Sequence, residues 1–152
     1  MSLLIRLESP ASPDAIRLVD ELEAHLAAQY PVTSRHGYSV EKLIREGVAF
    51  FVARWEGEPV GCGGVQHYAD GYGELKRMYV RPEFRGRGVA RALLERLTLH
   101  AVNEGAALLR LETGVHQREA IALYTKAGFR SMGPFGQYQP DPNSVFLEKA
   151  LA

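Results

Sequence analysis

A turn rich in glycine and arginine carries the strongest chemical signal in this sequence. Residues 78–90 read Met-Tyr-Val-Arg-Pro-Glu-Phe-Arg-Gly-Arg-Gly-Val-Ala, an apolar strand pattern that leads into a helix pattern. The N–H groups at the start of a helix have no acceptor within it and lie at the positive end of its dipole, so such a turn binds phosphate well. Two glycines and Ala90 permit close approach of a ligand, and Arg85 and Arg87 add positive charge. The alternative is a tight surface loop with solvated arginines.

Two other phosphate-binding motifs do not match this turn. A dinucleotide fingerprint requires Gly-x-Gly-x-x-Gly, and Arg91 stands where the third glycine belongs. A Walker loop requires Gly-Lys-Ser/Thr, which does not follow. The Arg-Gly-Arg-Gly string lies in an amphipathic helical unit, and RNA contact is therefore not favoured.

The composition describes an ordinary domain. Of the 152 residues, 46% are apolar and 24% charged, and a chain of this length buries about 68–70% of its unfolded surface without a metal or disulfide. The single Cys62 and the lack of a signal-peptide or membrane-span pattern favour a cytoplasmic protein without a membrane partner. The histidines show no zinc spacing, so we expect no metal. Overall neutrality argues against a nucleic-acid partner.

The neutral charge is a cancellation between two parts of the chain. Residues 75–96 hold seven basic and two acidic side chains, a balance of +5, and the remainder carries −5. Positive charge is therefore concentrated around the turn that we expect to bind an anion.

A mixed α/β fold is expected to position this turn, as one domain over residues 1–152. Strand patterns cover residues 3–7, 49–55, 60–68, 74–80, 108–115, 129–132 and 145–149. Helix patterns begin at Ser12 and at Ser39 as N-caps, and cover residues 89–101 and 121–127. The first helix is expected to bury Ile16, Val19, Leu22 and Leu26. A strand–helix–strand unit in the second half implies at least one parallel pair.

Two motifs together resemble the GNAT superfamily of N-acetyltransferases. Arg85-x-x-Gly88-x-Ala90 resembles the loop that binds the pyrophosphate of acetyl-CoA, and residues 112–129 resemble a later segment with an Ala-Ile-x-Leu-Tyr-x-Lys-x-Gly-Phe core. The remaining element order agrees over essentially the whole chain. The resemblance implies a mostly antiparallel sheet of about six to seven strands, with a parallel pair at the cofactor site and about four flanking helices.

The resemblance implies acetyl-CoA as co-substrate and assigns residues to it. The main chain of Met78, Tyr79 and Val80 pairs with the pantetheine arm as an added strand would. Turn amides hold the diphosphate, namely those of Arg85, Gly86, Arg87, Gly88, Val89 and Ala90. Gln117 stands where many relatives have Asn, so the same amide reaches toward pantetheine on a longer stem.

Two catalytic candidates follow from the same resemblance. Tyr124 matches a tyrosine that protonates the departing thiolate, and a phenol with a pKa of about 10 can donate to a thiolate whose conjugate acid has a pKa of about 8.5. Its alternative role is packing on the core. Glu74 lies eleven residues before Arg85, where some members place the base that deprotonates the amine, often through water. Its alternative role is an ion pair on an exposed strand with Lys76 or Arg77.

Three residues are candidates for acceptor binding, namely Arg35, His36 and Tyr38. They lie between the first two helices, where the superfamily varies, and a cation there would hold an acceptor carboxylate. Residues 133–146, rich in proline and aromatic side chains, either wall the acceptor site, cover a sheet edge or contribute to a dimer. Cys62 is expected to be a buried thiol, and an acyl-cysteine route is the weaker alternative.

These features predict an acetyl-CoA-dependent N-acetyltransferase. A primary amine of a small molecule is expected to attack directly in a ternary complex. The protein is expected to be a monomer or a homodimer. The alternatives are acetylation of a protein or peptide, and a non-catalytic acyl-CoA sensor.

Overall fold

A single mixed sheet organises the computed structural model, which describes residues 2–35 and 37–151. Within these residues the strand order is β1-β2-β3-β4-β5-β7-β6, and only β4 and β5 pair in parallel. The strands are β1 Leu3–Leu7, β2 Ala49–Trp55, β3 Glu58–His67, β4 Tyr72–Val80, β5 Leu108–Gly114, β6 Arg130–Met132 and β7 Ser144–Ala150. The α-helices are α1 Pro13–Ala27, α2 Val40–Arg45, α3 Val89–Asn103 and α4 Arg118–Lys126. The expected fold class is confirmed.

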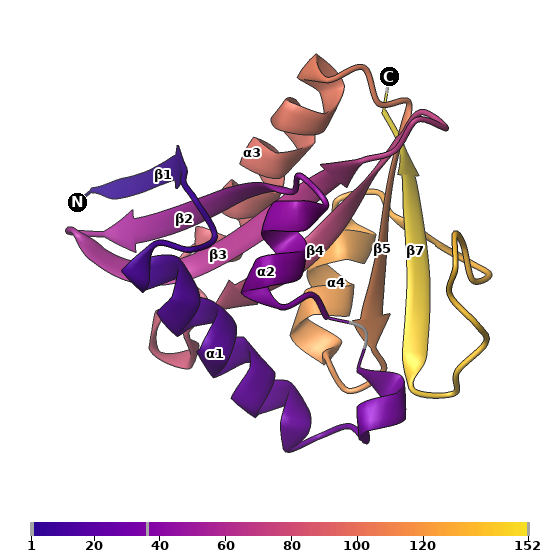
Figure 1. The fold of residues 1–152 in the computed structure, drawn as a ribbon, viewed down its shortest axis with the longest axis horizontal. Helices are drawn as coiled ribbons and strands as arrows, with labels where there is room; N and C mark the ends of the chain where they lie inside the picture. Colours follow the sequence, from indigo (N-terminus) through magenta and orange to yellow (C-terminus); the bar gives the residue numbers. More distant parts are fainter. Residues whose placement is uncertain (1, 36, 152) are drawn as a thin grey trace.

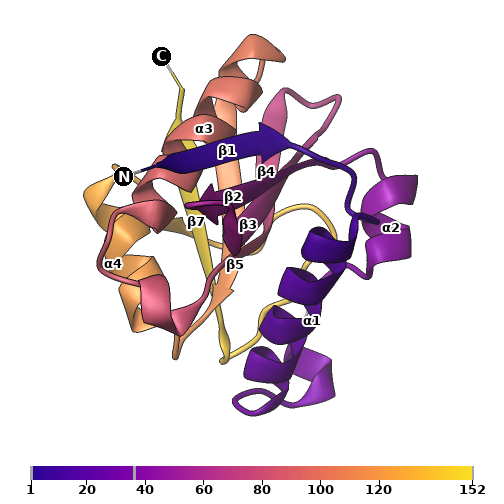
Figure 2. The same ribbon diagram turned by 90° about the vertical axis from the view of Figure 1, so that its left-hand side faces the viewer.

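Helices cover both faces of the sheet, as Figures 1 and 2 show, with α1 and α2 on one side and α3 and α4 on the other. Alternate residues of β2 enter the two resulting cores. Phe50 and Val52 pack with α1 and α2, whereas Phe51 and Ala53 belong to the core under α3. The central strands are thus buried on both faces, and functional side chains must come from their ends or from irregular positions.

The face that α1 buries contains the expected Val19 and Leu22, with Leu26 packed beside them, but not Ile16. Its buried residues are Ala15, Leu18, Val19 and Leu22, whereas Ile16 is 39% exposed. The buried set follows the i, i+3, i+4, i+7 template of an amphipathic helix. Ile16 lies one residue, or about 100° of helix, away from the start of that set.

Helix starts are confirmed for the first two helices. The Ser12 side chain accepts a hydrogen bond from the Ala15 amide at 3.2 Å, and Ser39 does the same for Lys42 at 3.1 Å. The β2–β3 turn is tighter than expected, because Glu56 and Gly57 both have positive φ and form a two-residue hairpin loop. Strand β3 therefore begins at Glu58.

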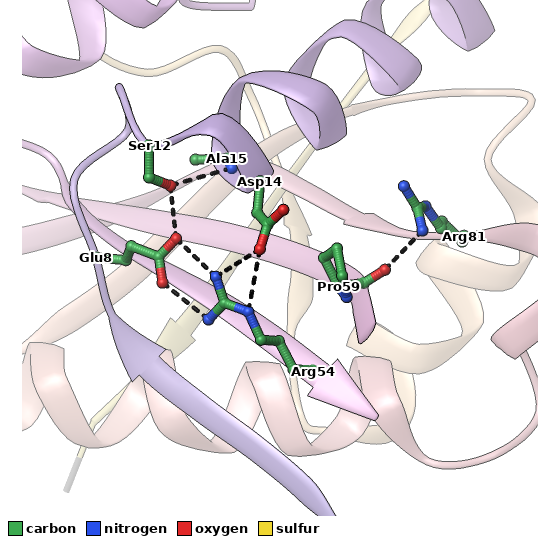
Figure 3. A network of polar contacts seen from close by, with 7 residues as sticks. All are labelled: Glu8, Ser12, Asp14, Ala15, Arg54, Pro59 and Arg81. Atoms are coloured by element: carbon green, nitrogen blue, oxygen red, sulfur yellow. Dashed lines mark hydrogen bonds and ion pairs between the residues drawn. The ribbon is translucent and has the colours of Figure 1, made fainter. Parts of the chain in front are cut away.

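Two arginines fasten α1 to the sheet. Arg54 of β2 donates to both carboxylate oxygens of Glu8 at 2.9 Å and to Asp14 at 2.9 Å, as Figure 3 shows. This guanidinium holds the pKa of Glu8 below its usual value. Arg81, which follows β4, donates to the Pro59 carbonyl (Figure 3) and to both oxygens of Glu21 on α1. One wall of the cleft described below is thereby held in place.

Candidate active site

The site begins where β4 and β5 separate. Their parallel pairing joins Tyr72–Glu74 only to Leu108–Arg110, and β4 continues to Val80 without a partner on that side. A bulge lies in the same stretch: Cys62 pairs with Tyr79 and Gly64 with Lys76, so two residues of β4 oppose one of β3. Arg77, in the bulge, has a φ of +55°. The main chain after Glu74 is thus left free to pair with an extended ligand.

A cleft of about 550 Å³ occupies this opening, a volume ordinary for small-molecule sites. Helix α1, the following loop, β4, the start of α3, the end of β5 and α4 supply its walls. Nearly all of the predicted cofactor residues line it, namely Met78, Tyr79, Val80, Arg85, Gly86, Gly88, Val89, Ala90 and Gln117. Arg87 does not, because its guanidinium lies over the rings of Trp55 and Phe84 at 5.6 and 5.2 Å.

The turn before α3 has the geometry of an anion site. Gly86 and Gly88 have φ of +76° and +84°, and a Cβ on either would meet no atom within 4 Å. Backbone conformation therefore requires these glycines. Among the described residues, no amide from Gly86 to Ala90 donates a hydrogen bond to the chain. Arg85 is held to the end of β4 by its Nε, which donates to the Val80 carbonyl at 3.2 Å. These features fit the diphosphate and pantetheine of acetyl-CoA.

The positive charge counted over residues 75–96 is partly neutralised in the fold. Three of the basic residues pair with carboxylates, as Lys76–Glu74, Arg77–Glu23 and Arg81–Glu21. In the described part of the chain, Arg85, Arg87, Arg91 and Arg96 form no ion pair. Of those four, Arg85 and Arg91 line the cleft.

Tyr124 lies on α4 in the wall of the cleft. Its side chain is 4% exposed and packs edge-on against Phe129, with ring centroids 5.5 Å apart. Burial raises the pKa of its phenol. A hydroxyl in this position stays protonated at neutral pH and can donate a proton.

Glu74 is buried behind the cleft rather than exposed in it. It is 2% exposed and does not line the cleft. Its carboxylate accepts hydrogen bonds from Lys76 Nζ at 2.8 Å, Tyr138 Oη at 2.6 Å and Tyr68 Oη at 3.1 Å. The ion pair with Lys76 thus exists, but on a buried strand and not on the exposed one expected from the sequence. Arg77 pairs with Glu23 instead.

The acceptor candidates Arg35 and Tyr38 both line the cleft, and His36 lies outside the described residues. Among residues 2–35 and 37–151, Arg35 Nε is buried without a hydrogen-bond partner. The ring of Tyr38 lies between two ammonium groups, 4.4 Å from Lys42 Nζ and 4.0 Å from Lys76 Nζ. This end of the cleft therefore offers cationic side chains to an acceptor.

Gln117 contacts the residues that follow α1. Its Nε2 donates to Gln29 Oε1 at 2.6 Å, and Tyr30 Oη accepts both this group at 3.4 Å and the His116 amide at 2.9 Å. The Tyr30 and His116 rings stack with centroids 5.4 Å apart. In this arrangement Gln117 joins two walls of the cleft, a role that the sequence did not indicate.

Tyr138 is a cleft residue that the sequence analysis did not single out. It comes from the 133–146 segment, lines the cleft and donates to Glu74. Its ring packs edge-on against Phe135 and Phe146, at 5.1 and 5.4 Å between centroids. The aromatic content of the segment was the available signal, but it did not indicate which residue reaches the site.

Cys62 is fully buried, as expected, and lies away from the cleft lining. Burial raises the pKa of its thiol to about 12. Its Sγ donates to the Arg77 carbonyl at 3.4 Å. Within residues 2–35 and 37–151, no cluster of three His, Cys, Asp or Glu side chains could hold a metal, and no helix is long and apolar enough to cross a membrane.

Comparison with known proteins gives one consistent result. The model of the acetyltransferase (GNAT) family matches residues 17–129. The chain is 44% identical to a protein of Azospirillum brasilense named IAA acetyltransferase, over 99% of each chain. It superposes on a Klebsiella pneumoniae protein provisionally named an acyl-CoA N-acyltransferase, with a TM-score of 0.84 and 36% identity. The match covers 99% of this chain and 98% of the Klebsiella protein. PaiA N-acetyltransferase of Thermoplasma acidophilum, solved with coenzyme A, shares the fold at a TM-score of 0.78, 22% identity and 99% and 100% coverage.

Proposed function

The chain belongs to the GNAT acetyltransferase family, and on that premise we propose that it transfers an acetyl group from acetyl-CoA to the primary amine of a small molecule. The observation that carries the proposal is the cleft between β4 and β5, which has free backbone amides at one end and buried polar side chains at the other. The residues proposed for the cofactor and those proposed for the acceptor line one cleft, which supports direct attack in a ternary complex.

Backbone groups hold the cofactor in this proposal. The amides from Gly86 to Ala90 hold the diphosphate at the positive end of α3, and Arg85 adds a full charge. The main chain of Met78–Val80, which β5 does not pair with, holds the pantetheine arm on that side, as an added strand would be held. Arg87 acts from outside the cleft lining, through its charge and its own amide. When bound, acetyl-CoA supplies an activated thioester.

The side chains of the acceptor end move the protons. Tyr124, whose hydroxyl burial keeps protonated, donates a proton to the departing sulfur and regains one from the nitrogen as the amide forms. An amine is protonated at neutral pH and must lose a proton before it attacks, and Glu74 is the base that receives it.

Arg35 and Tyr38 bind the acceptor. A buried guanidinium nitrogen without a partner, at the cleft wall, suits a carboxylate that accepts two parallel hydrogen bonds. We therefore assign an acceptor that carries an acidic group, such as an amino acid derivative. The relative named IAA acetyltransferase supports a small-molecule acceptor over a protein.

A thiol-release assay tests the proposal. Purified protein is mixed with acetyl-CoA and, separately, with amines, amino acids and short peptides, and release of free coenzyme A is compared with a reaction without acceptor. We expect turnover with small acceptors, fastest with those that carry a carboxylate. Binding of acetyl-CoA without turnover on any acceptor would instead identify a sensor, and a preference for peptides would identify a protein acetyltransferase.

A further inference from the structure

A buried base poses a problem of access. Glu74 is 2% exposed and does not line the cleft, although the acceptor amine must bind there. Its carboxylate is surrounded by three donors, Tyr68, Lys76 and Tyr138. A proton that leaves the amine must therefore pass through one of these three groups to reach Glu74.

We propose that Tyr138 is a catalytic residue that relays the acceptor's proton to Glu74, a step that rests on the proposed function. Tyr138 lines the cleft, and its Oη lies 2.6 Å from Glu74 Oε2. A phenolic hydroxyl both donates and accepts hydrogen bonds, so it can receive one proton while passing on another.

The other two partners of Glu74 do not meet both requirements. Lys76 lines the cleft, but its ammonium group, paired with Glu74 at 2.8 Å, has donors only and no acceptor. Tyr68 has a suitable hydroxyl, yet it bonds to the other carboxylate oxygen at 3.1 Å and does not line the cleft. Tyr138 alone among the three combines a hydroxyl with access to the cleft.

The relay conserves every proton. Before the nitrogen attacks, one N–H bond of the protonated amine breaks, and a new O–H bond forms at Tyr138 Oη. In the same movement the original Tyr138 O–H bond breaks, and its proton bonds to Glu74 Oε2. The tyrosine ends neutral, Glu74 ends protonated, and the nitrogen keeps the electron pair with which it attacks. Glu74 later returns its proton to water along the same path.

The surroundings of Tyr138 favour this concerted path over a free phenolate. Burial and the charge of Glu74 raise the pKa of Tyr138, so the ring does not lose its proton in advance. Phe135 and Phe146 hold the ring in place. The Tyr138 amide also donates to the Phe135 carbonyl at 3.0 Å, which fixes the backbone. A relay needs such fixed geometry.

Two matched variants test the relay. Tyr138→Phe and Tyr68→Phe each remove one hydroxyl and one hydrogen bond to Glu74, but only Tyr138 lines the cleft. We expect Tyr138→Phe to lower kcat by about 10²-fold or more at neutral pH, as loss of base catalysis does. We expect Tyr68→Phe to lower it by less than about tenfold, since only one bond to Glu74 is lost. Acetyl-CoA affinity and melting temperature check that both variants are folded.

The pH profile separates a relay from a structural role. Without a base, the reaction depends on the fraction of acceptor that is already deprotonated, which rises about tenfold per pH unit below the pKa of the amine. The loss of kcat in Tyr138→Phe should therefore become smaller as pH rises, and the loss of kcat in Glu74→Gln should do the same. The double variant should be no slower than either single one, because both act in one path.

Defined outcomes overturn the proposal. Equal losses in Tyr138→Phe and Tyr68→Phe, or a deficit that does not change with pH, would make Tyr138 a structural residue only. Glu112, whose carboxylate accepts a bond from Ser144 Oγ at 2.7 Å, also lines the cleft. A large loss in Glu112→Gln with a normal Tyr138→Phe would place the base there. An inactive wild type would refute the proposed function instead, which keeps the two failures distinct.

Discussion

Backbone groups form one end of the cleft, and buried side chains form the other. The cofactor end consists of backbone: a bulged strand that β5 leaves unpaired on one side, two glycines with positive φ and the free amides before α3. The acceptor end consists of buried side chains, in which Glu74, Lys76 and Tyr138 form one hydrogen-bonded group. Changes of backbone conformation should therefore damage cofactor binding, and changes of single side-chain atoms should damage catalysis and acceptor choice.

Tyr124, where the two ends meet, should give the largest effect. Tyr124→Phe keeps the packing against Phe129 and removes only the proton donor. We expect kcat to fall by about 10²-fold, with the KM of both substrates nearly unchanged. Steady-state kinetics measure this change, and the loss should be smaller with a thioester whose thiol is more acidic. A wild-type kcat at every pH would remove Tyr124 from the mechanism.

A change in the glycine turn should affect mainly the KM for acetyl-CoA, whereas Tyr124→Phe affects mainly kcat. Gly88→Val places a branched residue at a φ of +84°, where the left-handed conformation costs about 1–2 kcal/mol, and the turn amides will shift. We expect the KM for acetyl-CoA to rise roughly tenfold. Gly47, with a φ of +67° outside the cleft, provides the control. Gly47→Val should lower the melting temperature and leave the KM for acetyl-CoA unchanged. An equal rise of this KM in Gly47→Val and Gly88→Val would contradict the assignment of the turn to cofactor binding.

Arg35 should affect the acceptor alone. Arg35→Ala removes a charged donor from the acceptor end, and we expect the KM of an acidic acceptor to rise roughly fivefold, the net contribution of one typical hydrogen bond. The KM for acetyl-CoA should stay the same. Arg35→Lys keeps the charge without the planar guanidinium, and its KM for the acceptor should lie between those of the wild type and Arg35→Ala. An unchanged acceptor KM in Arg35→Ala would exclude the assignment.

Cys62 should give the smallest effect. Its thiol is buried, lies away from the cleft lining and has a pKa raised to about 12. Cys62→Ala should therefore leave kcat within about twofold of wild type, and thiol reagents should not label the native protein. A folded but inactive Cys62→Ala protein would instead support an acyl-cysteine route.

The same division explains what the sequence could predict. The cofactor end lies in one continuous stretch, so glycine spacing and the strand-to-helix pattern of residues 78–90 were sufficient to predict the strand, the turn and the helix that form it. The helix caps at Ser12 and Ser39 were equally local. The acceptor end joins residues far apart in the chain, and the contact of Tyr138 with Glu74 spans 64 positions. Such a contact depends on the path of a proline-rich loop, which has no periodic pattern.

Packing also decided two features that local patterns did not indicate. Arg87 shares the spacing of the other turn residues, but its guanidinium finds the aromatic faces of Trp55 and Phe84. Glu74 was expected either to act as a base or to lie on an exposed strand. Its burial follows from the central position of β4 between β3 and β5, which only the topology reveals.

The bulge at Arg77 also connects the two ends of the cleft through a hydrogen bond. Arg77 holds β4 open, and its Nε donates to the Tyr38 carbonyl at 2.8 Å in the acceptor loop. A ligand that tightens this loop acts on the strand that receives the other ligand. Thermodynamic reciprocity then requires each substrate to change the affinity of the other by the same factor. Selection for a new acceptor in this fold will therefore also change how strongly the donor is held.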